Sequence, residues 1–375
     1  MRHATMVSRW IAAGTALGLF AGCAGPERSP AALSALPAAG ESQWVRYGAD
    51  GRLVYQATPA GDRIMDFSHA GYMGGGVALP DVTVKTTVHP SAGDDTGVIQ
   101  AAIDLVSNLP LVDGFRGAVV LAPGTYEISG TLHLTADGVV LRGSGSGAQG
   151  GQRTTLQLTG EPHLAIAVRR PDGGDGEQRS TIPGAETTIA DGYVPSGTRR
   201  FRVENTGGFS VGDTVLIRKP VTVAWVEHMR MHDLVRDGET QTWLEPGSTV
   251  DSERTITALE GNTIEVDVPL SDAYDASYLN PPGTAVVRIP GPDRVRRAGV
   301  EHLHISAPPM AVSHTQSHYT ALRMSGQDLW ARDLWIEETM NSVAVGGRRI
   351  TLERVHVQRE ARSQGSSRPA EFAPN

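Results

Sequence analysis

Cysteine is nearly absent from this 375-residue chain, which contains only one, Cys23. An intramolecular disulfide is therefore excluded, and any fold has to be stabilised by its hydrophobic core. Aromatic residues make up only 5% of the chain, which is few for a surface that binds sugars by ring stacking. The formal net charge is -8 with both signs mixed along the chain, so no basic face indicates a nucleic-acid partner.

The apolar run near the N-terminus, Trp10 to Phe20, is too short to span a bilayer as a helix. Basic residues precede it and Ala-Gly-Cys follows it, which is typical of an export signal. The sequence LFAGC resembles a bacterial lipobox, in which Cys23 would be lipidated, although Phe20 stands where a smaller aliphatic residue is usual. An ordinary secretory signal cut nearby is the alternative.

We therefore expect a signal peptide of the lipoprotein type over 1–23. Residues 24–42 are rich in Ala, Pro, Gly and Ser and are expected to form a flexible tether. The predicted location is the cell envelope, on its periplasmic or surface side, or the secreted medium. Contact with a membrane is expected only through the lipid anchor, and the oligomeric state stays open.

The 44 glycines and 23 prolines follow no collagen period and indicate many turns. The stretch from Gly93 to Gly145 shows how they are used. Asp94, Asp95 and Thr96 can start a helix, and a helical apolar face follows, which Pro110 ends. That face consists of Ile99, Ala102, Ile103 and Val106, and the β-rich runs behind it are Ala118–Leu121, Tyr126–Leu134 and Val139–Leu141. One helix followed by short strands suits a helix that caps the open end of a stack of β-coils.

The segments GDDTGVIQAAID, PGTYEISGTLHL and VVLRGSG resemble the start of the pectate-lyase superfamily, in particular its rhamnogalacturonase/epimerase-like branch. The upstream DFSHAGYMGGGVALP is similar to the lead-in of many such proteins, and the resemblance covers Asp66 to about Gly160. It implies an all-β fold, a right-handed parallel β-helix with an N-terminal capping helix, and a surface that faces carbohydrate. The superfamily contains lyases, hydrolases, epimerases and phage adhesins, so the resemblance does not fix a reaction.

The domain organisation follows from changes in composition. We expect 43–199 to hold a short hairpin that turns at 49–51, the cap helix, the first coils and a loop over 169–199. A small inserted β-module is expected over 200–289, with hairpins that turn at 207–208 and 260–262 and a helix over 223–235 between them. Further coils are expected over 290–375. The last residues, RPAEFAPN, read as neither coil nor cap, so we expect the chain to be a fragment of a longer protein.

A repeat becomes visible after residue 298. GVEHLHIS (299–306), RDLWIEE (332–338) and ERVHVQR (353–359) superpose so that apolar pairs coincide, and alternation predicts that these pairs face inward. The pairs are Leu303 with Ile305, Leu334 with Ile336, and Val355 with Val357. The positions between and after them are then expected to form two outward rows, His304–Trp335–His356 and Ser306–Glu337–Gln358.

The outward rows are the predicted site of a polysaccharide. Sugar sites combine an aromatic platform, a carboxylate and basic groups. We expect Arg359, His356 and Glu337 to be catalytic. Substrate-binding residues are expected to be Trp335, His304, Gln358, Arg362 and, from a polar loop over 314–319, His318. The structural alternative is a solvated polar face without a site.

Several reactions stay open for this site. A hydrolase needs two carboxylates across the bond, and Glu337 and Glu338 are adjacent and therefore on opposite faces. The Asn-Thr-Asp, Asp-Asp, His-Gly and Arg-Ile-Lys motifs of polygalacturonase-type hydrolases are not recognisable. A lyase needs a base and either calcium or cationic side chains that neutralise a uronate. Calcium stays open as a cofactor, although no acidic cluster has the spacing of a calcium loop. We favour a lyase on an acidic polysaccharide; the alternatives are a non-catalytic carbohydrate-binding or surface-display protein, a glycoside hydrolase and an epimerase.

Two weaker motifs favour structural interpretations. The glycine pattern GxGxxG over 145–150 precedes a strand-like RTTLQLTG rather than a helix, which indicates a turn between coils and not a dinucleotide site. His228 and His232 have helical spacing, but HMRMH lacks the order of a zinc helix and no third ligand is evident.

Overall fold

The computed structural model describes residues 42–148, 150–171, 181–241, 243–311 and 316–360. The chain divides into two units after Val54. On the N-terminal side, β1 (Val45–Tyr47) pairs with β2 (Leu53–Tyr55), and Gly51 N donates to Gly48 O at 3.0 Å in the turn between them. The hairpin predicted to turn at 49–51 is therefore confirmed. No helix within the described residues is long and apolar enough to cross a membrane.

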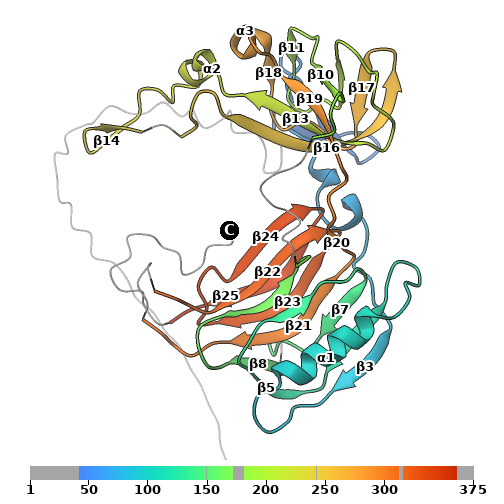
Figure 1. Cartoon of the computed structure of the whole chain (residues 1–375), viewed down its shortest axis with the longest axis vertical. Helices are drawn as coiled ribbons and strands as arrows, with labels where there is room; N and C mark the ends of the chain where they lie inside the picture. Colours follow the sequence, from blue (N-terminus) through green and yellow to red (C-terminus); the bar gives the residue numbers. More distant parts are fainter. Residues whose placement is uncertain (1–41, 149, 172–180, 242, 312–315, 361–375) are drawn as a thin grey trace, which may run out of the picture. The chain divides into compact units, whose positions relative to one another are not determined.

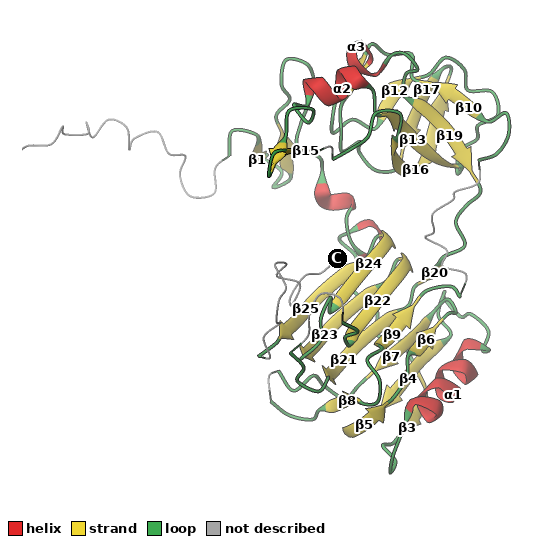
Figure 2. Ribbon diagram, turned by 60° about the vertical axis from the view of Figure 1, so that its left-hand side comes forward, coloured by secondary structure: helices red, strands yellow, loops and turns green. Residues whose placement is uncertain are grey.

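A five-stranded and an eight-stranded parallel sheet form the coils of the second unit (Figures 1 and 2). The eight-stranded sheet bends at a corner, and we call its two halves the first and second sheets and the five-stranded sheet the third. The first sheet contains β3 (Val84–Val88), β4 (Gly117–Leu121), β7 (Val139–Arg142) and the N-terminal halves of β21 (Gly299–Ser306), β23 (Trp330–Glu337) and β25 (Thr351–Gln358). The second sheet contains β5 (Gly124–Ile128), β8 (Thr154–Leu158) and the C-terminal halves of β21, β23 and β25. The third sheet contains β6 (Leu132–Leu134), β9 (Leu164–Val168), β22 (Thr320–Gln327), β24 (Val343–Arg348) and β20 (Val295–Arg296). Each coil visits the sheets in the same order, which is the predicted parallel β-helix.

Strands β21, β23 and β25 pass from the first sheet to the second at a single kinked residue each. Their kinks are His302, Asp333 and Arg354, with φ of 58°, 52° and 52°. This left-handed backbone, which residues other than glycine rarely adopt, turns the chain around the corner without ending the strand. The three residues are stacked, because their neighbours pair on both sides, Glu301 with Arg332 and Leu303 with Leu334. We call them the kink row.

The predicted repeat is confirmed residue by residue. Leu303 pairs with Leu334 and Leu334 with Val355, and the row of Ile305, Ile336 and Val357 pairs in the same register. The members of these rows on β21 and β23 are buried, and those on β25 pack against the same core. Alternation predicted this register because a shift by one residue would turn every apolar side chain outward.

Helix α1 (Thr96–Ser107) covers one end of the core, as predicted. Its buried face consists of Ile99, Ile103 and Val106, each fully buried, and it packs on β3, β4, β6 and β7. Asp94 fastens the start of the helix to the next coil by accepting from Thr96 and Ser129. The hydrogen bonds from these two hydroxyls lower the pKa of Asp94 to about 2, so its carboxylate is ionised at neutral pH.

The lead-in segment covers the outer side of the first sheet. Tyr72 N donates to Thr351 Oγ1 at 2.8 Å, and the Tyr72 ring meets the Trp330 ring edge-on at 5.3 Å. Val82, Ala118 and Val140 complete this small apolar cluster. The outer side of the second sheet instead carries exposed side chains such as Thr125, Glu127 and His356.

A six-stranded antiparallel sheet emerges between two adjacent coils. Its order is β10 (Glu186–Thr188), β19 (Ala285–Ile289), β13 (Thr214–Pro220), β16 (Thr249–Glu260), β17 (Thr263–Val266) and β12 (Arg200–Arg202). Phe201, Val215, Ile217 and Ile264 belong to its own hydrophobic core. The coil stack continues across it, because β7 and β8 pair directly with β21.

The smaller elements of this module lie beside the sheet. They are β11 (Tyr193–Val194) paired with β18 (Tyr274–Asp275), β14 (Val235–Arg236) paired with β15 (Glu239–Thr240), α2 (Val223–His228) and α3 (Ala276–Leu279). Helix α2 begins at the Thr222 cap, whose hydroxyl accepts from Trp225 N at 3.0 Å. The helix is therefore shorter than the predicted 223–235.

The strand pairing tests three predictions for this region: the start of the module and the two hairpins. Antiparallel pairing begins at Glu186 rather than at Arg200, because β10 pairs with β19, so part of the expected loop over 169–199 is strand. The hairpin expected to turn at 207–208 is wrong, since β12 pairs with β17 while β13 lies between β16 and β19. The hairpin that turns at 260–262 is confirmed by the pairing of β16 with β17.

Candidate functional site

The two predicted outward rows exist and extend over two further strands. One row is Thr125–Thr155–His304–Trp335–His356, and the other is Glu127–Gln157–Ser306–Glu337–Gln358. Both lie on the outer side of the second sheet, from β5 to β25. The sequence predicted only the members on β21, β23 and β25, because β5 and β8 precede the inserted module. We call the two rows the ladder.

Glu337 is the centre of a hydrogen-bond network in the ladder. Its carboxylate accepts from Trp335 Nε1 at 2.8 Å and from His304 Nε2 at 3.0 Å. On the other side of the imidazole, Thr155 Oγ1 donates to His304 Nδ1 at 3.2 Å. Because burial lowers the pKa of His304, we assign it as the neutral imidazole, in which Nε2 donates to Glu337 and Nδ1 accepts from Thr155.

The environment decides the charges in this network. Burial lowers the pKa of His304 from 6.5, and the opposing attraction of Glu337 does not reverse this. Burial by itself raises the pKa of Glu337, but the Trp335 hydrogen bond and the neighbouring His304 lower it overall. Because His304 is neutral at pH 7, the Trp335 donor is the main support of the ionised carboxylate.

Trp335 is not an open platform on the side of β25. The His356 ring stacks on it with centroids 3.9 Å apart and an interplanar angle of 26°. His356 itself is exposed, whereas Trp335 is half-buried. The exposed ring of this stack is therefore the imidazole of His356.

Arg359 lies away from the open face. Its side chain is only 2% exposed, and Nη1 donates to the carbonyl oxygen of Glu338 at 3.0 Å. Nη2 donates to the carbonyl oxygen of Met310. In this position the guanidinium joins two turns at the edge of the second sheet, and a polymer on the open face would not reach it.

The other predicted residues are dispersed. Gln358 Nε2 donates to Glu360 at 3.4 Å at the end of β25. His318 lies beside the next corner, where its Nδ1 bonds to the Gln316 carbonyl at 3.3 Å and its Nε2 to Asn341 at 3.2 Å. Cys23 and Arg362 lie outside the described residues.

A cleft of about 550 Å³ opens at the corner between the first and second sheets. It is lined by the kink row and by the glycine-rich turn that precedes β8. Its lining contains only polar side chains and glycine, namely Ser144, Gly145, Ser146, Gly147, Gly150, Gln152, His302, Asp333 and Arg354. We call it the corner cleft. The turn is the one predicted from GxGxxG, and it folds back so that Ser146 bridges Arg153.

Asp333 organises the corner cleft. Its two carboxylate oxygens accept from Ser146 Oγ and from His302 Nδ1, each at 2.7 Å. Burial raises the pKa of Asp333, but these two hydrogen bonds outweigh burial and lower it below 3.8. The sequence did not predict this grouping, although the same alternation that places His304 outward also places His302 outward two residues earlier.

Arg153 adds a cation between the corner cleft and the ladder. It is exposed and forms no ion pair within the described part of the chain. Its side chain lies against Gly147 of the corner cleft, and its charge disfavours protonation of both His304 and Glu337. Arg153 was not predicted, because nothing in its local sequence pattern distinguishes it from a solvated turn residue.

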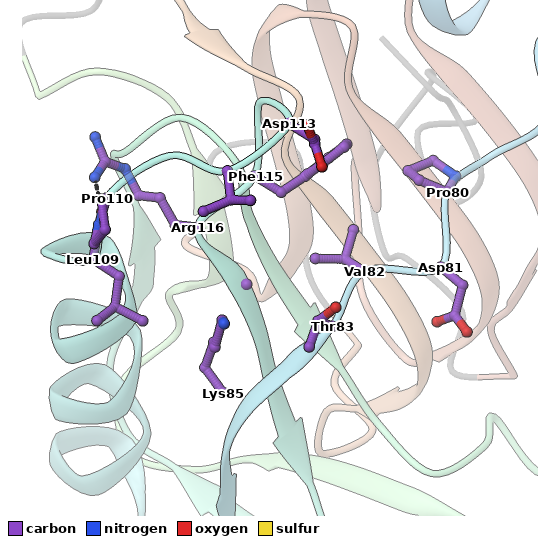
Figure 3. A pocket seen from close by; sticks show the side chains of 12 residues that line it. Pro80, Asp81, Val82, Thr83, Lys85, Leu109, Pro110, Asp113, Phe115 and Arg116 are labelled. Atoms are coloured by element: carbon purple, nitrogen blue, oxygen red, sulfur yellow. Dashed lines mark hydrogen bonds between the residues drawn. The ribbon is translucent and has the colours of Figure 1, made fainter.

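A second cleft, of about 480 Å³, opens beside the end of α1 (Figure 3). Its walls include Pro80, Val82, Leu109, Pro110 and Phe115, with charged side chains at the edge. The Arg116 guanidinium is held by the carbonyl oxygen of Leu109. Because these walls are apolar, this cleft suits the packing of apolar groups better than chemistry on a sugar.

Among the described residues, no group of three or more His, Cys, Asp or Glu side chains is arranged to hold a metal ion. The calcium requirement that the sequence left open is therefore still a prediction for experiment.

No protein-family model and no curated protein matches the chain. Among solved structures, the chain is similar to the Gp54 tailspike of Acinetobacter baumannii bacteriophage AP22, in complex with A. baumannii capsular saccharide. That similarity has 11% identity and a TM-score of 0.31, and it covers 72% of this chain and 46% of that chain. The tailspike gp61 of Pseudomonas phage phi297 matches at 14% identity and a TM-score of 0.31, over 71% of this chain and 42% of that chain. The tailspike protein gp49 from Pseudomonas phage LKA1 matches at 14% identity and 0.32, over 70% and 44%. The chain spans less than half the length of each.

Proposed function

We propose that the protein binds an acidic polysaccharide across the corner cleft and the ladder and cleaves it by β-elimination. The observation that carries this proposal is the charge pattern of the open face. Arg153, which has no ion-pair partner among the described residues, lies beside the corner cleft, whose described lining is polar side chains and glycine. Exposed Arg354 and exposed His356 follow on the same side of β25. Hydroxyl-rich polymers suit a polar cleft, and arginine side chains bind carboxylates in two-pronged geometry.

Elimination suits the carboxylates of this face better than hydrolysis does. A glycoside hydrolase needs one carboxylic acid with a raised pKa to protonate the leaving oxygen. The pKa values of Glu337 and Asp333 are both lowered. A lyase needs no such acid at the start of the reaction, only a base and a cation that neutralises the uronate.

Binding without cleavage is the second candidate. It is favoured by the Glu337 network, in which the carboxylate is already engaged by Trp335 and His304 and thus stabilises the face rather than standing free. An epimerase would use the same proton removal without breaking the glycosidic bond. The three functions differ in product: an unsaturated end, an unchanged polymer, or an inverted sugar.

The test is an ultraviolet assay against a panel of uronans, with calcium or with a chelator, alongside sedimentation of protein with insoluble polymer. Elimination yields an absorbing double bond. Arg153→Ala is expected to raise KM about 10-fold or more, because a charged hydrogen bond contributes about 1.5–3 kcal/mol. Arg323→Ala, which removes an exposed arginine of the third sheet, is the matched control. Retention of unchanged polymer would support the binding protein. The absence of both cleavage and retention would reject the proposal.

A further inference from the structure

We infer that the corner cleft holds the reacting sugar and that His302 is the base that takes its proton, positioned by Asp333. This inference rests on the proposed function and names the site within the open face where the chemistry occurs. It differs from the sequence-based expectation, which placed catalysis on Arg359, His356 and Glu337.

The hydrogen bond to Asp333 fixes the tautomer of the neutral His302 ring. An ionised carboxylate can only accept, so the 2.7 Å bond from His302 Nδ1 assigns the hydrogen of the neutral ring to that nitrogen. Nε2 then carries a lone pair, and it makes no hydrogen bond within the described part of the chain. The other oxygen of Asp333 is held by Ser146 at 2.7 Å, so the carboxylate cannot swing away from the imidazole.

Only His302 among the nearby imidazoles combines access with orientation. The side chain of His302 is 32% exposed, compared with 6% for His304. Both nitrogens of His304 are already bonded, to Thr155 and Glu337. His356 is exposed but stacks on Trp335, and no carboxylate among the described residues orients its ring. A base needs an available lone pair and a fixed direction, and His302 has both.

The reaction step balances with these groups. Nε2 of His302 takes the proton on the carbon next to the uronate carboxylate. The electron pair released forms a carbon–carbon double bond, and the bond from the neighbouring carbon to the glycosidic oxygen breaks. The departing oxygen takes up a proton, which His302 can return, so no oxidant or further reactant is needed.

Arg354 supplies charge where the transition state needs it. It is the third member of the kink row and lines the same cleft, with its side chain 51% exposed. As the proton leaves, negative charge grows on the uronate carboxylate, and a guanidinium beside that carboxylate stabilises it. The neighbouring Glu353 holds Arg354 at the rim.

The side chains of the kink row can be replaced without disturbing the backbone. Asn tolerates left-handed backbone, so His302→Asn, Asp333→Asn and Arg354→Asn remove the functional groups without adding backbone strain. Arg297→Asn is the matched control, because Arg297 has the same backbone (φ 53°) at the other corner of the first sheet. Melting temperatures within a few degrees of wild type verify the fold of each variant.

On a uronan that the wild type cleaves, His302→Asn is expected to lower kcat at least about 100-fold with KM nearly unchanged. Arg354→Asn is expected to raise KM as well. Asp333→Asn should lower kcat and shift the His302 hydrogen toward Nε2, as ¹⁵N spectra of the ring report; a merely structural role of Asp333 would leave that tautomer unchanged. A wild-type kcat in folded His302→Asn would overturn the inference about His302 but would not contradict the proposed lyase function.

A probe that does not depend on turnover separates the two proposals. Trigalacturonate is titrated into isotope-labelled protein, and the His302 ring signal is identified by its loss in His302→Asn. A saturable shift of that signal supports the corner cleft even if no polymer is cleaved. No shift at millimolar trigalacturonate, while the polymer is bound or cleaved elsewhere on the face, overturns the inference but not the function.

Discussion

His304 changes its affinity for protons when the chain folds. Burial lowers its pKa from 6.5, so the neutral ring bonded to Glu337 and Thr155 is the favoured form. The unfolded chain keeps the ordinary value and binds the proton first as the pH drops below about 6.5. The folded state therefore loses stability from about pH 6.5 down to the lowered pKa.

Urea unfolding at pH 7.5, 6.5 and 5.5 measures this effect. The wild-type midpoint is expected to fall toward pH 5.5, and His304→Gln, which keeps a donor and an acceptor but does not titrate, should show a weaker fall. His133→Gln replaces an exposed histidine of β6 and is the control. Equal midpoints of the wild type at all three pH values would contradict the role of burial.

At the residue scale, alternation predicted which side chains point outward but not which of them act together. The rows through His304 and Glu337 were correct because each member occupies the same step of a period-two pattern. The partnership of His302, Asp333 and Ser146 could not be predicted, because Ser146 comes from a different coil, far earlier in the sequence. Arg359 was misplaced because nothing local reveals that its side chain turns inward to two carbonyl groups.

At the scale of the element, α1 is the part that closes the end of the core. Ile103→Ala is expected to destabilise the protein by about 2–5 kcal/mol, because a fully buried side chain is lost and a cavity remains. Val98→Ala on the exposed side of the same helix should stay within about 0.5 kcal/mol. Chemical denaturation compares the two, and an equal cost for both would mean that α1 is only loosely packed on the coils.

A helix or hairpin could be predicted where a single local pattern specifies it. The helical spacing of Ile99, Ile103 and Val106 was sufficient to predict α1, and the strong turn signal at 260–262 was sufficient to predict the hairpin of β16 and β17. The sheet of the module was not predictable in this way, since β12 and β13 are consecutive in sequence and yet pair with β17 and β16, which lie far away in the chain, as in the pairs Phe201 with Ile264 and Thr214 with Thr255. Such long-range pairing depends on packing around Phe201 and Val215, which a turn signal does not reveal.

At the scale of the whole molecule, the sequence predicts an exported protein anchored through Cys23. Cys23→Ser is expected to move the protein from the membrane fraction to the soluble fraction of cells that process lipoproteins, because the acyl chains that hold it are lost. Fractionation followed by immunoblotting measures the change. An equal distribution of wild type and variant would support an ordinary secretory signal instead.

The left-handed backbone of the kink row has a mechanical consequence. Each of these three coils turns its corner at one residue, and His302, Asp333 and Arg354 are aligned in register at the same corner of successive coils. A coil that slipped by one residue in one direction would have to place Leu303, Leu334 or Val355 in that strained backbone. The kink row therefore disfavours this slip and helps to keep neighbouring coils in one register. The residues that help to keep this register are also those to which we assign the chemistry. The correct register of the coils and the correct placement of His302, Asp333 and Arg354 therefore depend on the same three backbone kinks.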